Sequence, residues 1–198
     1  MKIILASHSP RRKQLLIRLG FKFDIIPSNI DESQISTKIN AQEYCILLAK
    51  LKAEKISINY PNALIIGADT IVVIENQILN KPNNNIEAKN MLKMLSGKTH
   101  EVHTGVFIKC IEKNIQHSFN ETSKVTFNEI SEEEIIHYIN TYKPFDKAGS
   151  YGIQDWSSIF VNKIMGCYDN IVGLPISRLY KEFKKLHINL LDSTLKNS

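Results

Sequence analysis

Two adjacent arginines, Arg11 and Arg12, stand just inside the start of a predicted helix and suggest anion chemistry. Ser9 is a suitable N-cap and Pro10 a suitable first helical residue, so backbone N–H groups and the Ser7 hydroxyl gather at one helix end. Such an end attracts anions, and a guanidinium offers phosphate a planar pair of donors. Only 4 of the 25 cationic residues are arginine, so composition does not explain the pair. We expect a phosphate site; the alternative is a capped helix with two solvated arginines.

A carboxylate, Asp69, directly follows the most apolar run of the chain, residues 63–68. A carboxylate at the end of a buried strand needs an ion pair, a metal or a role in proton transfer. The alternative is an Asp that makes a turn with Thr70. Lys52, expected to face outward from a long helix, and Lys81 are candidate phosphate cations, although each alone is more often a solvated lysine.

A third polar segment, residues 146–154, contains two glycines and ends in an amide. Gly149 and Gly152 let the backbone approach a ligand closely, and Gln154 offers both a donor and an acceptor to a base edge. Alone this segment is a weak signal. Together the three segments predict a polyphosphate, a metal held by carboxylate and a polar group that reads a base.

Apolar runs and helical periodicity predict the elements that must position these residues. The expected strands are 2–6, 21–26, 63–68 with a continuation at 71–74 after an interruption by Asp69 and Thr70, a hairpin partner ending near Leu79, 99–112, 115–128 and 158–161. The expected helices run from Pro10 to Gly20, over 41–57 and 86–96, from the capping box of Ser131 and Glu134 to Thr141, and over 175–186. The fold class is therefore α/β, with a mixed twisted β-sheet flanked by helices.

Length and composition indicate one ordinary domain. A chain of 198 residues with 43% hydrophobic residues can bury a full core, so we expect a single domain over residues 1–190 and a frayed tail at 191–198. Cys45, Cys110 and Cys167 are odd in number and far apart, which favours a reducing compartment. No apolar run approaches the roughly 20 residues of a membrane span. These features predict a soluble, cytoplasmic protein with no membrane partner.

Three superficial signals are set aside. The net charge of +5 comes from scattered lysines rather than a basic stripe, so we expect no nucleic-acid partner. Residues 96–99 resemble the end of a P-loop, but they end a helix instead of opening one. His100 and His103 have an odd spacing on a strand, which sends them to opposite faces, so zinc is not expected.

Short blocks along most of the chain match a family pattern in order and spacing. They are Leu5-Ala6-Ser7-x-Ser9-Pro10-Arg11-Arg12-x-x-Leu15-Leu16, Asp31-Glu32, Leu48-Ala49-x-x-Lys52-Ala53, Gly67-Ala68-Asp69-Thr70, Lys81-Pro82, Leu95-Ser96-Gly97-x-x-His100-x-Val102-x-Thr104-Gly105-Val106, Asp146-Lys147-Ala148-Gly149-Ser150-Tyr151-Gly152-Ile153-Gln154 and Asn170-Ile171-Val172-Gly173-Leu174-Pro175. Over about residues 3–186 the chain thus resembles the Maf family of nucleoside triphosphate pyrophosphatases.

The resemblance implies a Maf/ITPase-like fold with a nucleotide cleft at the strand ends, and hydrolysis between the α- and β-phosphates to a monophosphate and pyrophosphate. It also implies a divalent metal cofactor, Mg²⁺ or Mn²⁺, a cytoplasmic location and a homodimer. By motif, Asp69 corresponds to the catalytic proton acceptor, and Arg11, Thr70 and Gln154 correspond to the substrate-specificity positions. The blocks resemble the dTTP/UTP branch. Asp155 departs from the glycine that commonly follows the glutamine.

On this interpretation Asp69 and Glu32 bind the metal, since Mg²⁺ prefers a few carboxylates with phosphate oxygens and water. The phosphate-binding residues are Ser7, Arg12, Lys52 and Lys81. Alternatives remain: a pyrophosphatase of the 7-methyl-GTP type, a non-catalytic nucleotide-sensing regulator of cell division, and a nucleic-acid-binding regulator.

Overall fold

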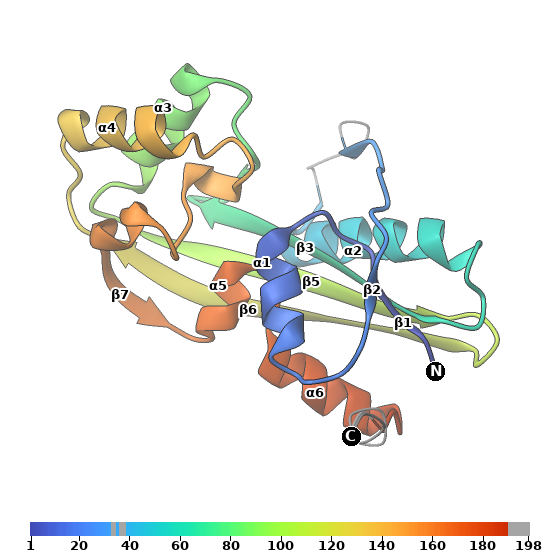
Figure 1. Cartoon of the computed structure of the whole chain (residues 1–198). Helices are drawn as coiled ribbons and strands as arrows, with labels where there is room; N and C mark the ends of the chain where they lie inside the picture. Colours follow the sequence, from blue (N-terminus) through green and yellow to red (C-terminus); the bar gives the residue numbers. More distant parts are fainter. Residues whose placement is uncertain (33–34, 36–38, 190–198) are drawn as a thin grey trace. The chain divides into compact units, whose positions relative to one another are not determined.

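The computed structural model describes residues 1–32, 35 and 39–189 (Figure 1). Its helices are α1 Pro10–Ile17, α2 Ala41–Ser57, α3 Asn85–Leu95, α4 Glu132–Tyr142, α5 Tyr168–Val172 and α6 Ile176–Lys185, with 3₁₀ segments η2 Ala148–Ser150 and η3 Trp156–Phe160. Its strands are β1 Ile3–Leu5, β2 Asp24–Ile25, β3 Leu64–Ile74, β4 Gln77–Leu79, β5 Thr99–Cys110, β6 Ile115–Phe127 and β7 Val161–Met165. The expected tail at 191–198 lies outside the described residues. No helix in the described part of the chain has the length and apolarity needed to cross a membrane.

The strands of the described chain form one mixed sheet in the order β2-β1-β3-β5-β6-β7, with β4 paired to β3. β1 is parallel to both neighbours, with Ile4 opposite Asp24 on one side and opposite Ile65 on the other. The β3–β4 and β6–β7 pairs are antiparallel. The predicted fold class, a mixed sheet flanked by helices, is confirmed.

Contacts divide the chain into two compact units. The first comprises Met1–Asp69, Thr104–Glu121 and Gly173–Ser198, and the second comprises Thr70–His103 and Thr122–Val172. The chain passes from one unit to the other within β3, β5 and β6, so neither unit is a contiguous stretch of sequence. The single domain expected over residues 1–190 stays a prediction.

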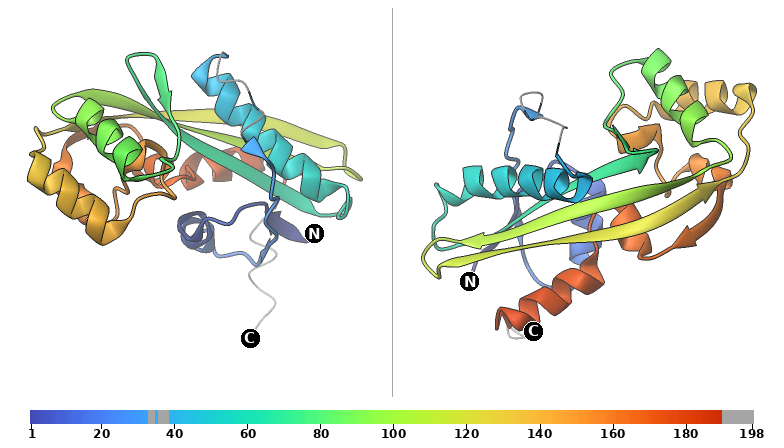
Figure 2. Two further views of the ribbon diagram at one scale, coloured as in Figure 1. Left: turned by 90° about the horizontal axis from the view of Figure 1, so that it is seen from above. Right: turned by 180° about the vertical axis from the view of Figure 1, so that it is seen from behind.

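In the first unit, α2 packs closely on one face of the strands. Ala49 and Ala53 of the helix share a buried cluster with Ile4 and Ile65. A Cβ atom at Gly67 would lie 2.1 Å from the Ala49 carbonyl oxygen, so the helix can approach β3 only because this position is glycine. Figure 2 shows α6 on the opposite side of the strands from α2.

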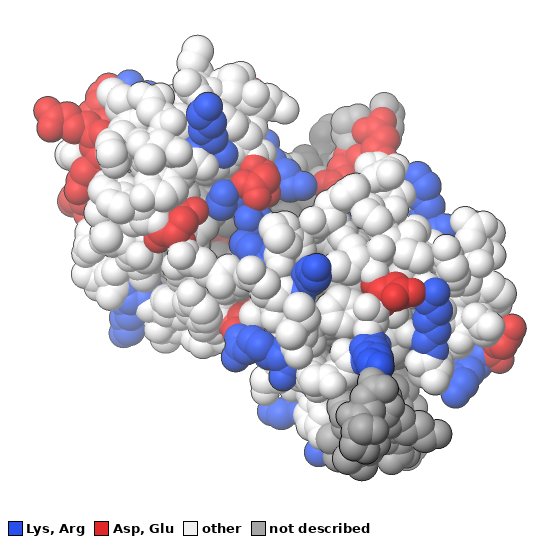
Figure 3. Space-filling model, viewed as in Figure 1, with Lys and Arg blue, Asp and Glu red and all other residues white. Residues whose placement is uncertain are grey.

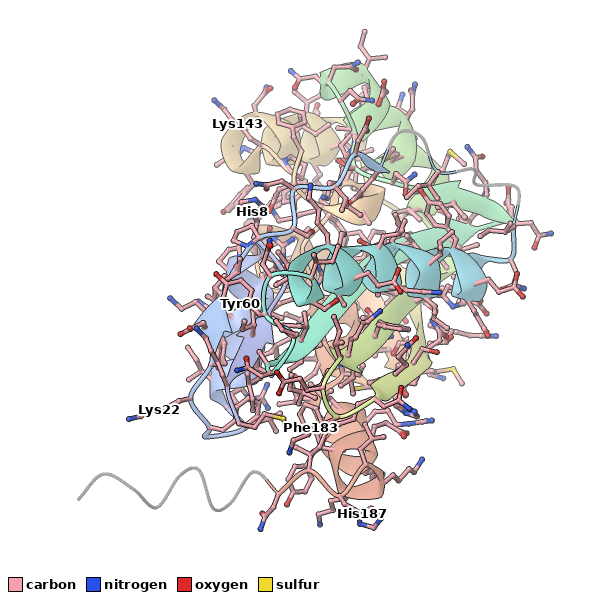
Figure 4. All side chains as sticks on the ribbon, turned by 90° about the vertical axis from the view of Figure 1, so that its right-hand side faces the viewer. His8, Lys22, Tyr60, Lys143, Phe183 and His187 are labelled. Carbon is pink, nitrogen blue, oxygen red and sulfur yellow. The ribbon has the colours of Figure 1, made fainter. Side chains whose placement is uncertain are left out.

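The α6 face of the first unit is closed by aromatic residues. Phe183 is fully buried and meets the ring of Phe21 edge-on at 6.2 Å between centroids. Figure 4 places Phe183 between α6 and the strands, whereas His187, past the end of the helix, lies on the outside. The unit therefore has apolar cover on both faces of its strands.

In the second unit, local turn and capping signals act as predicted. Glu75 and Asn76 have φ of 50° and 63°, the left-handed pair that a tight hairpin between β3 and β4 requires. Ser131 and Glu134 form a reciprocal capping box at the start of α4. α3 and α4 pack against each other in this unit.

Some expected elements differ from those observed. The strand expected at 21–26 is only Asp24–Ile25. Residues 158–160 of the strand expected at 158–161 belong to the 3₁₀ helix η3, and β7 begins at Val161. The sequence patterns do not predict helix α5. In each case tertiary pairing or packing selects a short element that has no strong local signal.

The expected interruption of the third strand is wrong. β3 continues from Leu64 through Asp69 and Thr70 to Ile74. A polar pair does not break it: β3 is also a neighbour of β5 in the sheet, and it pairs with β4 over residues 72–74, beyond the point where β1 has ended. Asp69 is thus an interior residue of a long strand.

Candidate active site

Lys52 is the centre of a charged cluster in the first unit. Its ammonium Nζ lies 2.5 Å from Asp69 Oδ1 and 2.7 Å from Glu32 Oε1. The residue is only 8% exposed, so the expectation that it faces outward is wrong. It follows Ala49 by three positions, and residues with that spacing share a helix face, here the face packed on the strands.

Asp69 is positioned by the unequal lengths of β1 and β3. β1 ends at Leu5, which pairs with Ile66 of β3, and Asp69 lies three residues further along. It is 6% exposed, so its carboxylate needs a partner, and the Lys52 ammonium provides one. The arrangement leaves a buried ion pair beside the end of a parallel strand.

The loop that carries Glu32 is tied to both neighbouring helices through Asn29. His8 Nε2 pairs with Asn29 Oδ1 at 2.5 Å, just before α1, and Lys55 Nζ of α2 donates to the Asn29 carbonyl oxygen at 2.7 Å. Figure 4 shows His8 near the start of α1. These contacts bring the loop to Lys52, and no sequence pattern signals them.

The start of α1 has the predicted cap. Ser9 Oγ accepts from the backbone N–H of Arg12 at 3.4 Å, and Ser7 Oγ accepts from the backbone N–H of Ser9 at 3.1 Å. Arg12 Nε donates to the Gly173 carbonyl oxygen at 2.8 Å, and its Nη1 lies 3.4 Å from Ser7 Oγ. Ser7 and Arg12 are therefore brought together, and their binding of phosphate stays a prediction.

Arg12 also experiences the charged cluster. Burial, the largest effect, and the nearby charge of Arg11 lower the pKa of the Arg12 guanidinium. The Asp69 and Glu32 carboxylates raise this pKa, but the net effect is a lowered pKa. Arg12 is thus electrostatically coupled to both carboxylates, and it belongs to the same constellation as Lys52.

The donor set fits a divalent cation of the Mg²⁺ type. Asp69 and Glu32 are close enough to share one cationic centre, the Lys52 ammonium. Within the described residues no three or more His, Cys, Asp or Glu side chains gather as a metal site. The protein would contribute two carboxylates, and phosphate oxygens and water the remaining ligands, as Mg²⁺ prefers.

Arg11 lies in α1 of the first unit, and three other expected site residues, Thr70, Lys81 and Gln154, belong to the second unit. Thr70 follows Asp69 in β3, so its side chain points to the opposite face of the strand. Lys81 is exposed just after β4, and Gln154 is exposed in the segment between η2 and η3. Lys147 pairs with Asp146 at 2.7 Å and lies 4.0 Å from Asp155.

The signals set aside in the sequence have structural roles. α3 ends at Leu95, and Gly97 has a φ of 67°, as expected for a helix end rather than a P-loop. His100 Nε2 pairs with the Tyr151 hydroxyl at 2.8 Å, whereas His103 Nδ1 pairs with Thr122 Oγ1 at 2.9 Å. Figure 3 shows lysine and arginine side chains spread over the face in view, without a continuous stripe.

Comparisons with known proteins agree on a family. The family model described as "Maf-like protein" matches residues 2–186. A "dTTP/UTP pyrophosphatase" of Bacillus cereus is 50% identical over 189 residues, covering 96% of this chain and 97% of the relative. A protein of the same name from Carboxydothermus hydrogenoformans is 46% identical over 185 residues, covering 93% and 98%. The solved structure of the Staphylococcus aureus Ham1 protein is 14% identical, with a TM-score of 0.44 over 64% of this chain and 72% of the other.

Proposed function

The chain belongs to the Maf family, and from this premise we propose that it hydrolyses dTTP and UTP to the nucleoside monophosphate and pyrophosphate. The observation that carries the proposal is the buried Lys52 ammonium shared by Asp69 and Glu32, beside the capped start of α1. A carboxylate pair, a cation and an anion-binding helix end are what metal-assisted attack on a polyphosphate needs.

The phosphate chain is held by residues around the start of α1. Ser7, Arg11 and Arg12 present a hydroxyl and two guanidiniums at a helix end whose dipole favours anions. Lys52 and Lys81 add ammonium groups that neutralise charge on the departing pyrophosphate.

Asp69 accepts the proton of the attacking water. The water oxygen forms a bond to the α-phosphorus while the bond from that phosphorus to the bridging oxygen of the β-phosphate breaks, and pyrophosphate leaves. A divalent metal bound by Asp69 and Glu32 would polarise the α-phosphate and lower its negative charge. Lys52, which contacts both carboxylates, orients them for these roles.

Base selection is assigned to Gln154, with Thr70 and Arg11 as further specificity residues. The Gln154 amide can donate to a pyrimidine carbonyl oxygen and accept from N3–H, which matches thymine and uracil. Cytosine presents an amino donor at position 4 and an unprotonated N3, so an amide held in one orientation rejects that edge.

Pyrophosphate release from a panel of triphosphates, with and without Mg²⁺, tests the proposal. We expect release from dTTP and UTP with the metal, and much slower release from CTP, ATP and GTP. A preference for 7-methyl-GTP would move the chain to the other branch of the family, and nucleotide binding without release would make it a sensor.

Two further proposals concern the protein in the cell. We propose a homodimer in the cytoplasm that binds neither nucleic acid nor membrane. Light scattering after size exclusion should give twice the mass of the 22.6 kDa chain, and a monomeric mass would contradict the dimer.

A further inference from the structure

Gln154 lies in a tight turn whose ends are bonded to each other. The backbone N–H of Asp155 donates to the Gly152 carbonyl oxygen at 3.0 Å, which closes a β-turn over residues 152–155. Ile153 is buried within this turn, whereas Gln154 is exposed. The turn therefore anchors one central residue and presents the other outward.

A single buried hydroxyl clamps both ends of the turn. The Tyr138 hydroxyl, from α4, accepts from the backbone N–H of Gly152 at 3.2 Å and donates to the Asp155 carboxylate, 3.1 and 3.2 Å from its two oxygens. Tyr138 is 0% exposed, and its ring packs against those of Trp156 and Phe160. The hydroxyl is therefore held in place from several sides.

Ser157 completes the clamp from the other side. Its Oγ lies 2.8 Å from the Gly152 carbonyl oxygen and 2.9 Å from Asp155 Oδ1, and its backbone N–H donates to Asp155 Oδ1 at 3.1 Å. The Asp155 carboxylate is thus also the N-cap of η3. Burial raises the pKa of Tyr138, so its hydroxyl keeps the proton that it donates to Asp155 at neutral pH.

We propose that Asp155 and Tyr138 are positioning residues that fix the turn bearing Gln154 and so set the choice of base. This inference rests on the proposed function and names the part of the chain that gives it selectivity. A fixed turn limits the positions from which the Gln154 amide can approach a base, whereas a mobile turn allows several approaches and weakens the distinction between uracil and cytosine. Asp155, which departs from the family pattern, thereby has a structural role: its carboxylate accepts the hydrogen bonds that hold the turn.

The test compares Tyr138→Phe and Asp155→Ala with the wild type. Tyr142→Phe is the matched control, because Tyr142 lies on the same helix and stacks on the same Trp156 but is itself exposed. The kcat and KM values for UTP and CTP, and the Tm, are measured for each protein. We expect the UTP:CTP ratio of kcat/KM to fall at least fivefold in both variants, mainly through a raised KM for UTP, and to stay unchanged in the control.

The two hypotheses fail in different ways. A merely structural role would lower the folded fraction and so reduce the activity toward UTP and CTP by the same factor. Variants that keep the wild-type UTP:CTP ratio of kcat/KM would therefore overturn this inference, whatever their Tm. A wild type that does not prefer UTP to CTP would instead overturn the proposed function. If Asp155→Ala fails to fold, Tyr138→Phe, which leaves the carboxylate and Ser157 in place, decides the result.

Discussion

The Lys52 ammonium lies 2.5 Å from Asp69 Oδ1, although a helix and a strand carry the two residues and 17 positions separate them. Both side chains are at most 10% exposed. Removing Lys52 leaves the buried Asp69 carboxylate without its cation, which costs on the order of 3–5 kcal/mol, whereas removing the charge of Asp69 leaves Lys52 its contact with Glu32. The carboxylate that we propose as catalytic is therefore held by packing as well as by charge.

Asp69→Asn should reduce kcat at least 100-fold while the fold is kept, because an amide matches the shape of the carboxylate but accepts no proton. Pyrophosphate release and circular dichroism measure the two effects. Asp24→Asn is the control, since Asp24 is an exposed carboxylate paired with Lys2 in the same unit. Retention of more than about a tenth of the wild-type kcat would argue against an essential role.

Lys52→Met should lower the Tm without metal, because Asp69 and Glu32 lose their shared cation. Added Mg²⁺ or Mn²⁺ should raise the Tm of this variant more than that of the wild type, since the metal replaces the missing charge. Thermal unfolding with and without metal measures both effects, and Lys50→Met on the same helix is the control. Equal metal-induced shifts in variant and wild type would contradict a metal at these carboxylates.

Arg11→Lys should lower kcat/KM for UTP at least tenfold although the charge is kept, because an ammonium cannot make the planar two-donor contact. Steady-state kinetics measure the loss. Lys13→Arg, at an exposed position of the same helix, is the matched control and should be neutral. Kinetics within twofold of the wild type would show that charge alone suffices at residue 11.

Gln154→Ala should reduce the difference in kcat/KM between UTP and CTP, because it should lower the value for UTP most. The side chain is exposed at a turn, so its removal should leave the Tm within about 1 °C of the wild type. Competition between UTP and CTP in one assay measures the ratio directly. An unchanged ratio would place base recognition elsewhere in the chain.

The buried His100 should make stability depend on pH. Burial lowers its pKa from 6.5 to about 4, so the unfolded chain takes up a proton at a higher pH than the folded one. The free energy of unfolding should therefore be constant with respect to His100 above pH 6.5 and fall as the pH drops toward 4. The total loss is about 3 kcal/mol, and below pH 4 there is no further loss from this residue. Urea unfolding between pH 7 and pH 4 measures the slope.

His100→Gln should flatten that slope, because the amide does not titrate. His137→Gln, at an exposed histidine, serves as the control and should keep the wild-type slope. Glu182 acts in a lower window: burial raises its pKa, but hydrogen bonds from Lys185, Arg178 and His117 lower it to about 2. The stabilisation by Glu182 is lost only as the pH falls from 4.5 toward 2. If the free energy of unfolding of His100→Gln fell between pH 6.5 and 4.5 as steeply as that of the wild type, His100 would not be the titrating group.

Local patterns predict well where the signal lies within a few residues. The cap at Ser9, the capping box at Ser131 and the α2 bounds of Ala41–Ser57 agree with the structure. The turn at Asn114, with a φ of 49°, also falls between the two expected long strands. Each is a backbone preference or a hydrogen bond between near neighbours, so the sequence contains the whole cause.

Patterns fail where burial depends on a distant partner. An outward Lys52 is the expectation because lysine is usually solvated, but Lys52 lies on the buried face of α2, four residues after Leu48 and four before Ile56. An interruption at Asp69 is the expectation because a carboxylate rarely lies inside an apolar strand, but that position receives the ammonium of Lys52. In both cases each residue alone gives the wrong expectation, and only the pair is satisfied.

The chemical groups and the family can be read from the chain alone: two arginines at a helix start, a carboxylate after an apolar run, an amide after two glycines, and the blocks that match Maf. Which groups meet depends on the folded structure. It joins Lys52 to Asp69 and Glu32, Arg12 to Gly173, and Tyr138 to both ends of the turn at Gln154. The reason is physical: propensity and capping act over a few residues, whereas desolvation makes a buried polar group depend on a partner that only packing can bring to it.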